Sequence, residues 1–533
     1  MAAFIPPTSP TGRWVSVDLF PTEAGGFFVE PAILSAMSHR QIASSTLWQI
    51  ASQATMALLS AVSVKFVAMG LSQELAGSYN SAYGYLQLFA ILADFGLYAV
   101  SVREVSAAKD KEKVLGGLIV LRSVITVLSL GFAVLIAWFV PAWRGTPLPV
   151  GITIAAFVPF FTLLAGVLRT VFQVTFMMHY VFIAEVLQRI LTAGLMALII
   201  VSGIRLSTDQ YVYEWFLWIG AFGAVLLFIL SCTFALRLMR VRPTFDRVLL
   251  MRMLRASAPY GVAFLCIALY RQFDLTMIAI LRDDFRLQNA VYGFASRVTE
   301  MTYLLPTFLL NSTLPVLSDR SARGEPTERL LGKTLLLVLI FGSASALFSF
   351  FWATPIMSVL TTPEYLETAG IPGSDTALSL LAAPMFLNGI VLFSFYTLLT
   401  KHEWKPLVLF MIGAVMISIT LNLYWIPSLG FIGAIKTSTI VHLFLCLTLF
   451  PCAIRSMPVS LPLGQIIRWL LFSLFLGTCL FFTAQFLTSV SWSVLGLALG
   501  AVCTGLLGYI LGFHKVFAFS TPAGELPVPS MAD

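Results

Sequence analysis

Long apolar stretches, separated by short polar joints, run along nearly the whole chain. Each is about long enough for a helix to cross a hydrocarbon core of ~30 Å. Lipid offers no water to bond backbone groups, and the stretches are too long for the strands of a membrane barrel. The pattern therefore predicts an all-α polytopic membrane protein. Its fourteen predicted spans are 45–70, 78–102, 114–140, 149–171, 177–202, 214–237, 254–281, 289–316, 332–360, 377–400, 406–426, 429–453, 464–488 and 491–512.

Basic residues outside the spans set the predicted orientation. Nearly all of them fall on alternate joints, on the side of the N-terminus. The opposite joints carry only Arg144, Arg205, Arg282 and Arg286. The positive-inside rule then predicts that both termini are cytoplasmic. This asymmetry also explains the net charge of +7 without a nucleic-acid partner, because no separate basic domain is present to bind a phosphate backbone.

Composition removes several functional classes. With 59% hydrophobic and 11% charged residues, the chain is not a water-soluble enzyme. Its six cysteines lack metal-ligand spacing and the setting of a disulfide framework. No Walker-type glycine loop is present, so neither a nucleotide nor any other cofactor is expected. The longest outer joint, Thr361 to Asp375, is too short for a catalytic surface, and its acids Glu364, Glu367 and Asp375 are expected to be solvated.

Two segments of the chain resemble each other. LAGSYNSAYGYLQLFAILADFGL (Leu75–Leu97) and LQNAVYGFASRVTEMTYLLPTFL (Leu287–Leu309) each follow a long helix that carries a cation, Lys65 in one and Arg271 in the other. A duplication of six helices would place two parallel, pseudo-symmetric lobes around a central cavity. The predicted organisation is a disordered cytoplasmic leader (1–40), an N-lobe of helices 1–6 (41–240), a C-lobe of helices 7–12 (241–455), helices 13–14 (456–515) and a disordered cytoplasmic tail (516–533).

Ionisable residues inside the spans are the main functional signal. An ion near the bilayer centre costs about 2.5–3.5 kcal/mol, so these residues must face a polar interior or one another. The candidate substrate-binding cations are Lys65, Arg122, Arg189, Arg271, Arg297 and Lys436. The candidate acids, for ion coupling or cavity salt bridges, are Asp94, Glu185, Asp274 and Glu300.

Several of these ions have an alternative, purely structural reading. Spacings of three or four residues would let one helix neutralise its own charges, in Glu185 with Arg189, Arg271 with Asp274, and Arg297 with Glu300. Asp94 could pair with Arg122 or Arg103, and Arg122 could extend toward the cytoplasm. Lys65 and Lys436 have no partner nearby in sequence. The surplus of cations suits an anionic cargo such as a phosphate-bearing lipid headgroup.

Four segments resemble one family. Gly77–Ser106, with Tyr79 followed by ADFGLYAVSVREVS, is similar to the second-helix signature of polysaccharide flippases in the multidrug/oligosaccharidyl-lipid/polysaccharide exporter superfamily. LRTVFQVTFMMHYVFIAEVLQRI (Leu168–Ile190) resembles the joint between helices 4 and 5, and YGFASRVTEMTYLLPTFLLNSTLPVLS (Tyr292–Ser318) the eighth helix. NLYWIPSLGFIGA (Asn422–Ala434) resembles the break between helices 11 and 12. The resemblance covers about residues 40–455.

The resemblance implies an inner-membrane transporter, not an enzyme. It would turn an undecaprenyl-pyrophosphate-linked oligosaccharide from the cytoplasmic to the periplasmic leaflet by alternating access, for O-antigen, capsule or exopolysaccharide synthesis. Cavity cations would receive the pyrophosphate and sugar, a role that falls on Lys65, Arg271, Arg297 and Lys436 by helix location. The leader and Lys436 depart from the family pattern. Implied partners are membrane lipids, a polysaccharide polymerase and chain-length proteins. A peptidoglycan-precursor flippase and, third, a multidrug antiporter remain as alternatives.

Overall fold

The computed structural model describes residues 39–94, 96–97, 101, 104–105, 108, 110–175, 177–239, 243–368, 370–401, 403–487 and 489–513. The predicted tail and all but the last two residues of the predicted leader lie outside this part. The described residues fold into α-helices and two short 3-10 turns, in agreement with the predicted all-α class.

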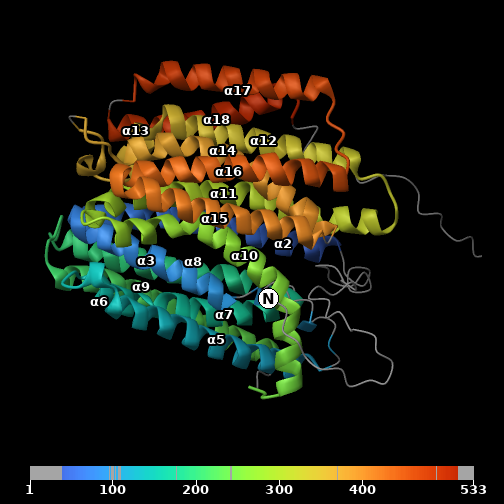
Figure 1. Ribbon diagram of the computed structural model, residues 1–533, viewed down its shortest axis with the longest axis horizontal. Coiled ribbons are helices and arrows are strands. Elements are labelled where there is room, and N and C mark those ends of the chain that lie inside the picture. Colours follow the sequence, from blue (N-terminus) through green and yellow to red (C-terminus); the bar gives the residue numbers. More distant parts are fainter. Residues whose placement is uncertain are drawn as a thin grey trace, which may run out of the picture.

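Among the residues that the structure describes, the first half of the chain forms seven helices (Figure 1). They are α2 (His39–Gly70), α3 (Gln73–Asp94), α5 (Lys111–Phe139), α6 (Leu148–Ala155), α7 (Phe157–Val174), α8 (His179–Val201) and α9 (Gln210–Leu238), with the 3-10 turn η1 (Pro141–Trp143).

The second half contributes the remaining helices and a second 3-10 turn, η2 (Pro363–Tyr365). The helices are α10 (Arg247–Leu281), α11 (Phe285–Ala322), α12 (Glu328–Phe351), α13 (Ala353–Leu360), α14 (Ser374–Thr400), α15 (Trp404–Leu429), α16 (Phe431–Ser456), α17 (Leu463–Ala484) and α18 (Val490–Ile510).

Each predicted span overlaps one helix or two consecutive helices, and eleven helices in the described part are long and apolar enough to cross a membrane. The chain is therefore a multi-pass membrane protein, while the count of fourteen spans stays a prediction. The three predicted spans outside the eleven correspond to α2, α3 and α11. The described apolar part of α2, Thr55–Gly70, is short, whereas α3 and α11 carry many polar residues. Polar helices of this kind must turn their polar faces away from lipid.

The helices of the two halves have the same order of neighbours. In the first half α2 packs on α8, α8 on α9, α9 on α7 and α3 on α5. In the second half α10 packs on α15, α15 on α16, α16 on α14 and α11 on α12. A duplication of six helices would produce this repetition. The halves meet along α3, which packs against both α10 and α11.

Helix α10 connects the two halves. Leu249 and Met253, in its first part, belong to a hydrophobic cluster with residues of α5 and α7. Ala263, Cys266 and Tyr270, in its later part, pack in a cluster with residues of α14, α15 and α16. One continuous helix is thus anchored in each half at a different end.

Helices α17 and α18 lie along one edge of the bundle, against α12 and α13 (Figure 1). They are the most lipid-accessible of the candidate spans, because only 22% and 6% of their apolar windows are buried. They are peripheral to the helices that surround the centre of the molecule.

The connection between α13 and α14 corrects one expectation from the sequence. Asp375 is only 7% exposed. It accepts hydrogen bonds from Thr354 Oγ1 at 2.8 Å and from the backbone N–H of Glu367 at 2.9 Å. The expectation of a solvated side chain was wrong for Asp375, because this carboxylate organises the joint itself.

Candidate functional site

A pocket lies where the two halves meet, between α3, α10 and α11. About 550 Å³ of space free of protein atoms lies within it, including open solvent at its mouth. It is lined by Asn80, Tyr83, Gly84, Gln87, Arg271, Gln272, Asp274, Leu275, Tyr292, Gly293, Ser296, Arg297 and Glu300. Helices α3 and α11, whose polarity is unusual for spans, thus turn polar residues toward this pocket.

Helix α3 builds one wall of the pocket from three side chains spaced by three and four residues, Asn80, Tyr83 and Gln87. This spacing places them on one helix face. Gly84 lies on the same wall, and a Cβ there would come within 2.8 Å of Leu275 Cδ1. Glycine at this position therefore allows α3 and α10 to approach closely.

The two arginines of the pocket rest on tyrosine rings. Arg271 Cζ lies 4.3 Å from the ring centroid of Tyr303, and Arg297 Cζ lies 5.6 Å from that of Tyr83. Both distances fall within the range of cation–π attraction. Within the described part of the chain, neither guanidinium forms an ion pair. Their positive charges are therefore held in place without being neutralised.

The two acids of the pocket bind neutral donors. Asp274, 2% exposed, accepts hydrogen bonds from Tyr292 Oη at 3.0 Å and Asn422 Nδ2 at 2.9 Å. Glu300 Oε1 accepts one from Gln272 Nε2 at 3.3 Å. Neutralisation of Arg271 by Asp274, and of Arg297 by Glu300, was the alternative expected from their spacing, and it is wrong. The four side chains share one pocket with their charges unpaired.

Arg189 lies beside this pocket, on α8. It is half-buried and close enough to Arg297, Tyr79 and Tyr83 to interact with them electrostatically. The rings of Tyr79 and Tyr83 are 4.8 Å apart. Glu185, which was a candidate partner of Arg189, accepts from Arg169 Nη1 of α7 at 3.1 Å.

Arg122 has a structural partner. Its Nη1 lies 2.5 Å from Asp94 Oδ1, and the arginine is only 4% exposed. The pair joins α5 to the end of α3 and does not line the pocket. Asp94 and Arg122 therefore form the ion pair that was the structural alternative expected from the sequence.

Lys65 also lies away from the pocket. Its Nζ donates to the carbonyl of Ser358 at 3.2 Å and to the carbonyl of Thr361. These are carbonyls of the last turn and C-cap of α13, a position where a cation is favourable. Lys65 thus ties the first half of the molecule to the second.

Lys436 is exposed, and it lies on the outer surface of α16. It shares a helix face with Ile440, Leu443 and Leu447, which are 39%, 47% and 69% exposed. Such an apolar face is directed to lipid. Lys436 is five residues from the start of α16, where its long side chain can reach the interface. Its predicted place in the cavity is therefore wrong.

The pocket is closed at the end where α3 and α11 begin. Arg286 Nη1 forms an ion pair with Glu74 Oε2 at 2.6 Å. Asn80 Nδ2 donates to the carbonyl of Asn289 at 3.1 Å, and Asn289 Nδ2 donates to Ser81 Oγ at 2.8 Å. These contacts join α3 to α11 directly, so the two halves are in contact at this end.

The pocket opens in the opposite direction. Along α3 and α11, Asn80 and Tyr292 near the closed end are 2% and 4% exposed. Gln87 and Glu300, farther along the same helices, are exposed. Accessibility therefore rises away from the closed end, as in a transporter that is open to one side.

Our interpretation of the sequence missed the neutral residues of the pocket. Tyr83, Gln87 and Gln272 were not candidates, nor was Tyr303, although it holds Arg271. A usable signal was present in α3, because Asn80, Tyr83 and Gln87 repeat at helical spacing within an otherwise apolar segment.

Comparison with known proteins agrees with this architecture. The family model described as polysaccharide biosynthesis protein matches residues 42–320, slightly more than half of the chain. None of the curated proteins compared with the chain matches it significantly.

Solved transporter structures share the fold. A structure described as "Lipid II flippase MurJ, inward closed conformation" has a TM-score of 0.67 at 15% identity, over 89% of this chain and 99% of that one. An inward-facing multidrug resistance MATE family transporter of the MOP superfamily has a TM-score of 0.58 at 14% identity, over 77% and 98%. The MATE multidrug transporter DinF-BH has a TM-score of 0.57 at 14% identity, over 78% and 95%.

The helices, the membrane spans and a charged pocket between two halves give this chain the fold of these solved transporters. With a family model that covers more than half of its residues, the chain belongs to the polysaccharide biosynthesis protein family.

Proposed function

We propose that this protein translocates an undecaprenyl-pyrophosphate-linked oligosaccharide across the bacterial inner membrane for the synthesis of a cell-surface polysaccharide. The pocket between the two halves would hold the headgroup, and the halves would alternate between opening to the cytoplasm and to the periplasm. With both termini cytoplasmic, the open end of the pocket faces the cytoplasm, where such lipids are made.

One observation carries the proposal: Arg271 and Arg297 face the pocket with their charges unpaired and are held by tyrosine rings. Two desolvated cations in an apolar bundle are costly unless an anion joins them. Guanidinium groups bind phosphate oxygens with two parallel hydrogen bonds. A pyrophosphate diester fits this requirement.

The direction of transport agrees with the charge of the cargo. A pyrophosphate diester carries about two negative charges, and an inside-negative potential of 100 mV favours outward movement by ~2.3 kcal/mol per charge. The membrane potential would therefore assist export without a nucleotide. Asp274 and Glu300 are the acids placed in the pocket to carry a coupling ion.

A peptidoglycan-precursor flippase is the second candidate. The likeness to the lipid II flippase over 89% of this chain favours it, although at 15% identity the likeness concerns the fold. Both cargoes would present a pyrophosphate to Arg271 and Arg297, so the pocket arginines do not separate them. The two functions differ in the lipid that accumulates when transport stops.

The test is a deletion of the gene, complemented with wild type, Arg271→Ala/Arg297→Ala or Arg205→Ala. Undecaprenyl-linked intermediates are quantified in each leaflet, together with surface polysaccharide. The double variant should trap oligosaccharide-linked lipid on the cytoplasmic side and reduce export at least tenfold, because each charge-assisted bond is worth about 1.5–3 kcal/mol. Arg205→Ala, which removes an exposed cation outside the pocket, should export normally.

Two results would contradict the proposal. Normal export by the double variant, at normal abundance in the membrane, would remove the pocket from the mechanism. Accumulation of peptidoglycan precursor with lysis of the deletion strain would instead establish the second candidate.

A further inference from the structure

The pocket contains hydrogen-bonding atoms that have no partner among the residues that the structure describes. Gln272 Oε1 is buried and accepts no hydrogen bond, while the Nε2 of the same amide donates to Glu300. Gln87 reaches the pocket from α3, and within the described residues its side chain has no hydrogen-bond partner. A buried polar atom without a hydrogen bond costs free energy, so Gln272 Oε1 calls for a partner from outside the chain, and the exposed amide of Gln87 is free to bond the same partner.

The chemistry of these atoms differs from that of the neighbouring arginines. Gln272 Oε1 and an ionised Glu300 are hydrogen-bond acceptors and therefore need a donor. A phosphate diester offers only acceptor oxygens, so it would satisfy Arg271 and Arg297 but not these two groups. Hydroxyl and amide N–H groups can donate to them, and sugars carry these groups at high density.

The two kinds of chemistry are adjacent. Gln272 follows Arg271 in the chain, and Glu300 lies one helical turn from Arg297. Residues three apart on a helix are about 5–6 Å from each other, a spacing that one hexose attached to a phosphate can span. Gln87 lies on the opposite wall, one turn beyond Tyr83 and toward the open end.

We infer that Gln272, Glu300 and Gln87 form a subsite for the hydroxyl and amide groups of the sugar attached to the pyrophosphate, next to the anion subsite of Arg271 and Arg297. The inference rests on the proposed function and adds that different residues of the pocket bind different parts of the headgroup. The arginines recognise the carrier phosphate that all such lipids share, and the amides and the acid recognise the first sugar.

The experiment compares two pyrophosphate diesters of undecaprenol with the same charge: undecaprenyl-pyrophosphoryl-N-acetylglucosamine and the methyl ester of undecaprenyl pyrophosphate, which carries no sugar and is called the capped lipid below. Affinities are measured for the full-length protein in lipid nanodiscs. Gln272→Met keeps the length of the side chain and removes its hydrogen bonds, and Gln87→Met does the same at an exposed position where folding is not at risk. Gln210→Met, at an exposed amide outside the pocket, is the matched control.

Wild type should bind the glycosylated lipid more tightly. Gln272→Met and Gln87→Met should each weaken binding of the glycosylated lipid about five- to tenfold and leave the affinity for the capped lipid unchanged. Arg297→Ala should weaken binding of both lipids, and Gln210→Met should affect neither.

Contrary outcomes separate the inference from the proposed function. Equal affinity of wild type for the two lipids, or an equal loss on both in the glutamine variants, would overturn the sugar subsite and leave the anion subsite intact. If wild type binds neither lipid, the proposed function fails, and the subsite fails with it.

Discussion

At the scale of single residues, the tyrosine beneath each arginine explains how the pocket keeps its charge. An arginine paired with the acid three residues away would be neutral as a unit and would offer little to an anion. The ring of Tyr303 holds Arg271 at 4.3 Å by attraction to its π face, which leaves all the donors of the guanidinium free. The neutral support thus combines positioning with an available charge.

Tyr303→Leu should therefore impair the anion subsite without removing any charge. The loss of a cation–π contact worth about 0.5–2 kcal/mol should lower affinity for undecaprenyl pyrophosphate about three- to thirtyfold. Tyr303→Phe keeps the π face and should bind nearly as wild type does. Similar losses in both variants would show that the hydroxyl, not the ring, supports Arg271.

The sequence predicted the four ions that line the pocket but not their partners, and it also proposed six ions that do not line it. Arg271, Asp274, Arg297 and Glu300 line one cavity, as residues that must avoid lipid should. Spacing along a helix brings two side chains within reach, yet their rotamers are chosen by neighbouring helices. Tyr292 and Asn422 take Asp274 away from Arg271 in this way, and neither contact is visible in local spacing.

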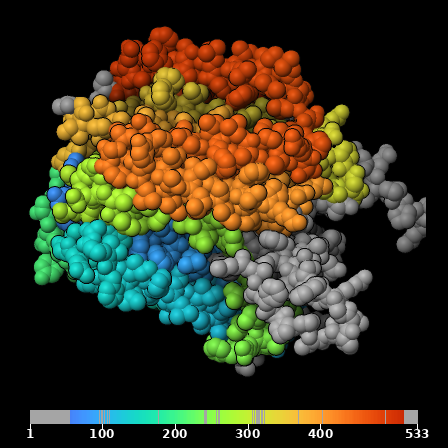
Figure 2. All heavy atoms as spheres, in the orientation of Figure 1, coloured from blue at the N-terminus to red at the C-terminus, as the bar shows by residue number. Residues whose placement is uncertain are grey.

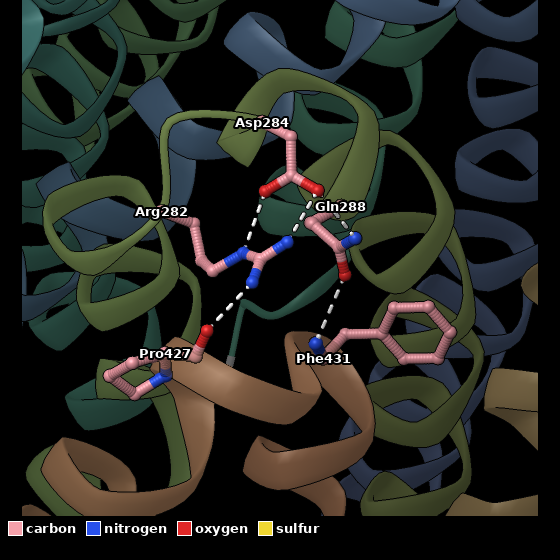
Figure 3. Close-up of polar contacts among 5 residues, drawn as sticks. All are labelled: Arg282, Asp284, Gln288, Pro427 and Phe431. Atoms are coloured by element: carbon pink, nitrogen blue, oxygen red, sulfur yellow. Dashed lines mark hydrogen bonds and ion pairs between the residues drawn. The ribbon is translucent and has the colours of Figure 1, made fainter.

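At the scale of elements, side chains fasten the α10–α11 turn to the α15–α16 turn (Figure 3). Arg282 donates from Nε and Nη2 to the two carboxylate oxygens of Asp284, at 2.7 and 2.8 Å, and from Nη1 to the carbonyl of Pro427 at 2.7 Å. Gln288 Nε2 donates to Asp284 at 3.0 Å, and its Oε1 accepts from the N–H of Phe431 at 3.1 Å.

The first half fastens the equivalent turns with backbone bonds. Ser72 N–H donates to the carbonyl of Ser207 at 2.9 Å, and Ser207 N–H donates to that of Gly70 at 2.9 Å. In each half the turn between the first two helices of the repeat is therefore tied to the turn between its last two. The two halves thus make the same junction with different bonds, backbone bonds in the first half and side-chain bonds in the second, as expected for a duplication whose copies have diverged.

Asp284→Asn should weaken the junction in the second half. The hydrogen bonds from Arg282 lower the pKa of Asp284 below its ordinary value, so its carboxylate stabilises the fold at neutral pH. The variant should unfold several degrees below wild type in detergent at pH 7. A depressed pKa means that this advantage is lost as the pH falls below about 4, where wild type and variant should converge.

Asp283→Asn is the matched control, because the neighbouring acid is exposed. Its unfolding temperature should equal that of wild type at pH 7. A difference between Asp284→Asn and wild type that does not shrink as the pH falls below about 4 would mean that the charge of Asp284 is not what holds the two turns together.

The positions of the helices along the chain were largely predictable from the sequence. The rotation of each helix about its own axis, which decides the face that meets lipid, was not. Each predicted span overlaps observed helices because apolar length is a local property of the sequence. The weak repeat of Leu75–Leu97 with Leu287–Leu309 identified α3 and α11, the two helices that meet at the pocket. Lys436 was misplaced because the sequence does not say which face of α16 meets lipid. In Figure 2 the orange residues of α15 and α16 form part of the face turned to the viewer.

At the scale of the whole molecule, the contacts that join the two halves at the closed end of the pocket are non-covalent and can be broken. The largest hydrophobic cluster crosses this end and includes Leu71, Trp143, Phe294 and Tyr365. Polar contacts reinforce it, among them the ion pair of Arg286 with Glu74 and the bonds of Lys65 to α13. In alternating access these contacts must separate when the pocket opens to the other side.

Lys65→Met should shift the molecule toward that second state. The change removes two hydrogen bonds from a charged donor, each worth about 1.5–3 kcal/mol, only in the conformation closed at this end. The population open there should rise tenfold or more. In a variant without native cysteines, Arg205→Cys and Ile371→Cys would introduce one exposed cysteine in each half. Spin labels attached to these cysteines would report the change as a longer label-to-label distance in pulsed electron paramagnetic resonance.

Lys65→Arg is the control. It retains a donor to the same carbonyls, so its distance distribution should stay near that of wild type. If Lys65→Met leaves that distribution unchanged yet abolishes binding of undecaprenyl pyrophosphate, Lys65 contacts the cargo in a state other than this one, and its bonds to α13 are not a latch.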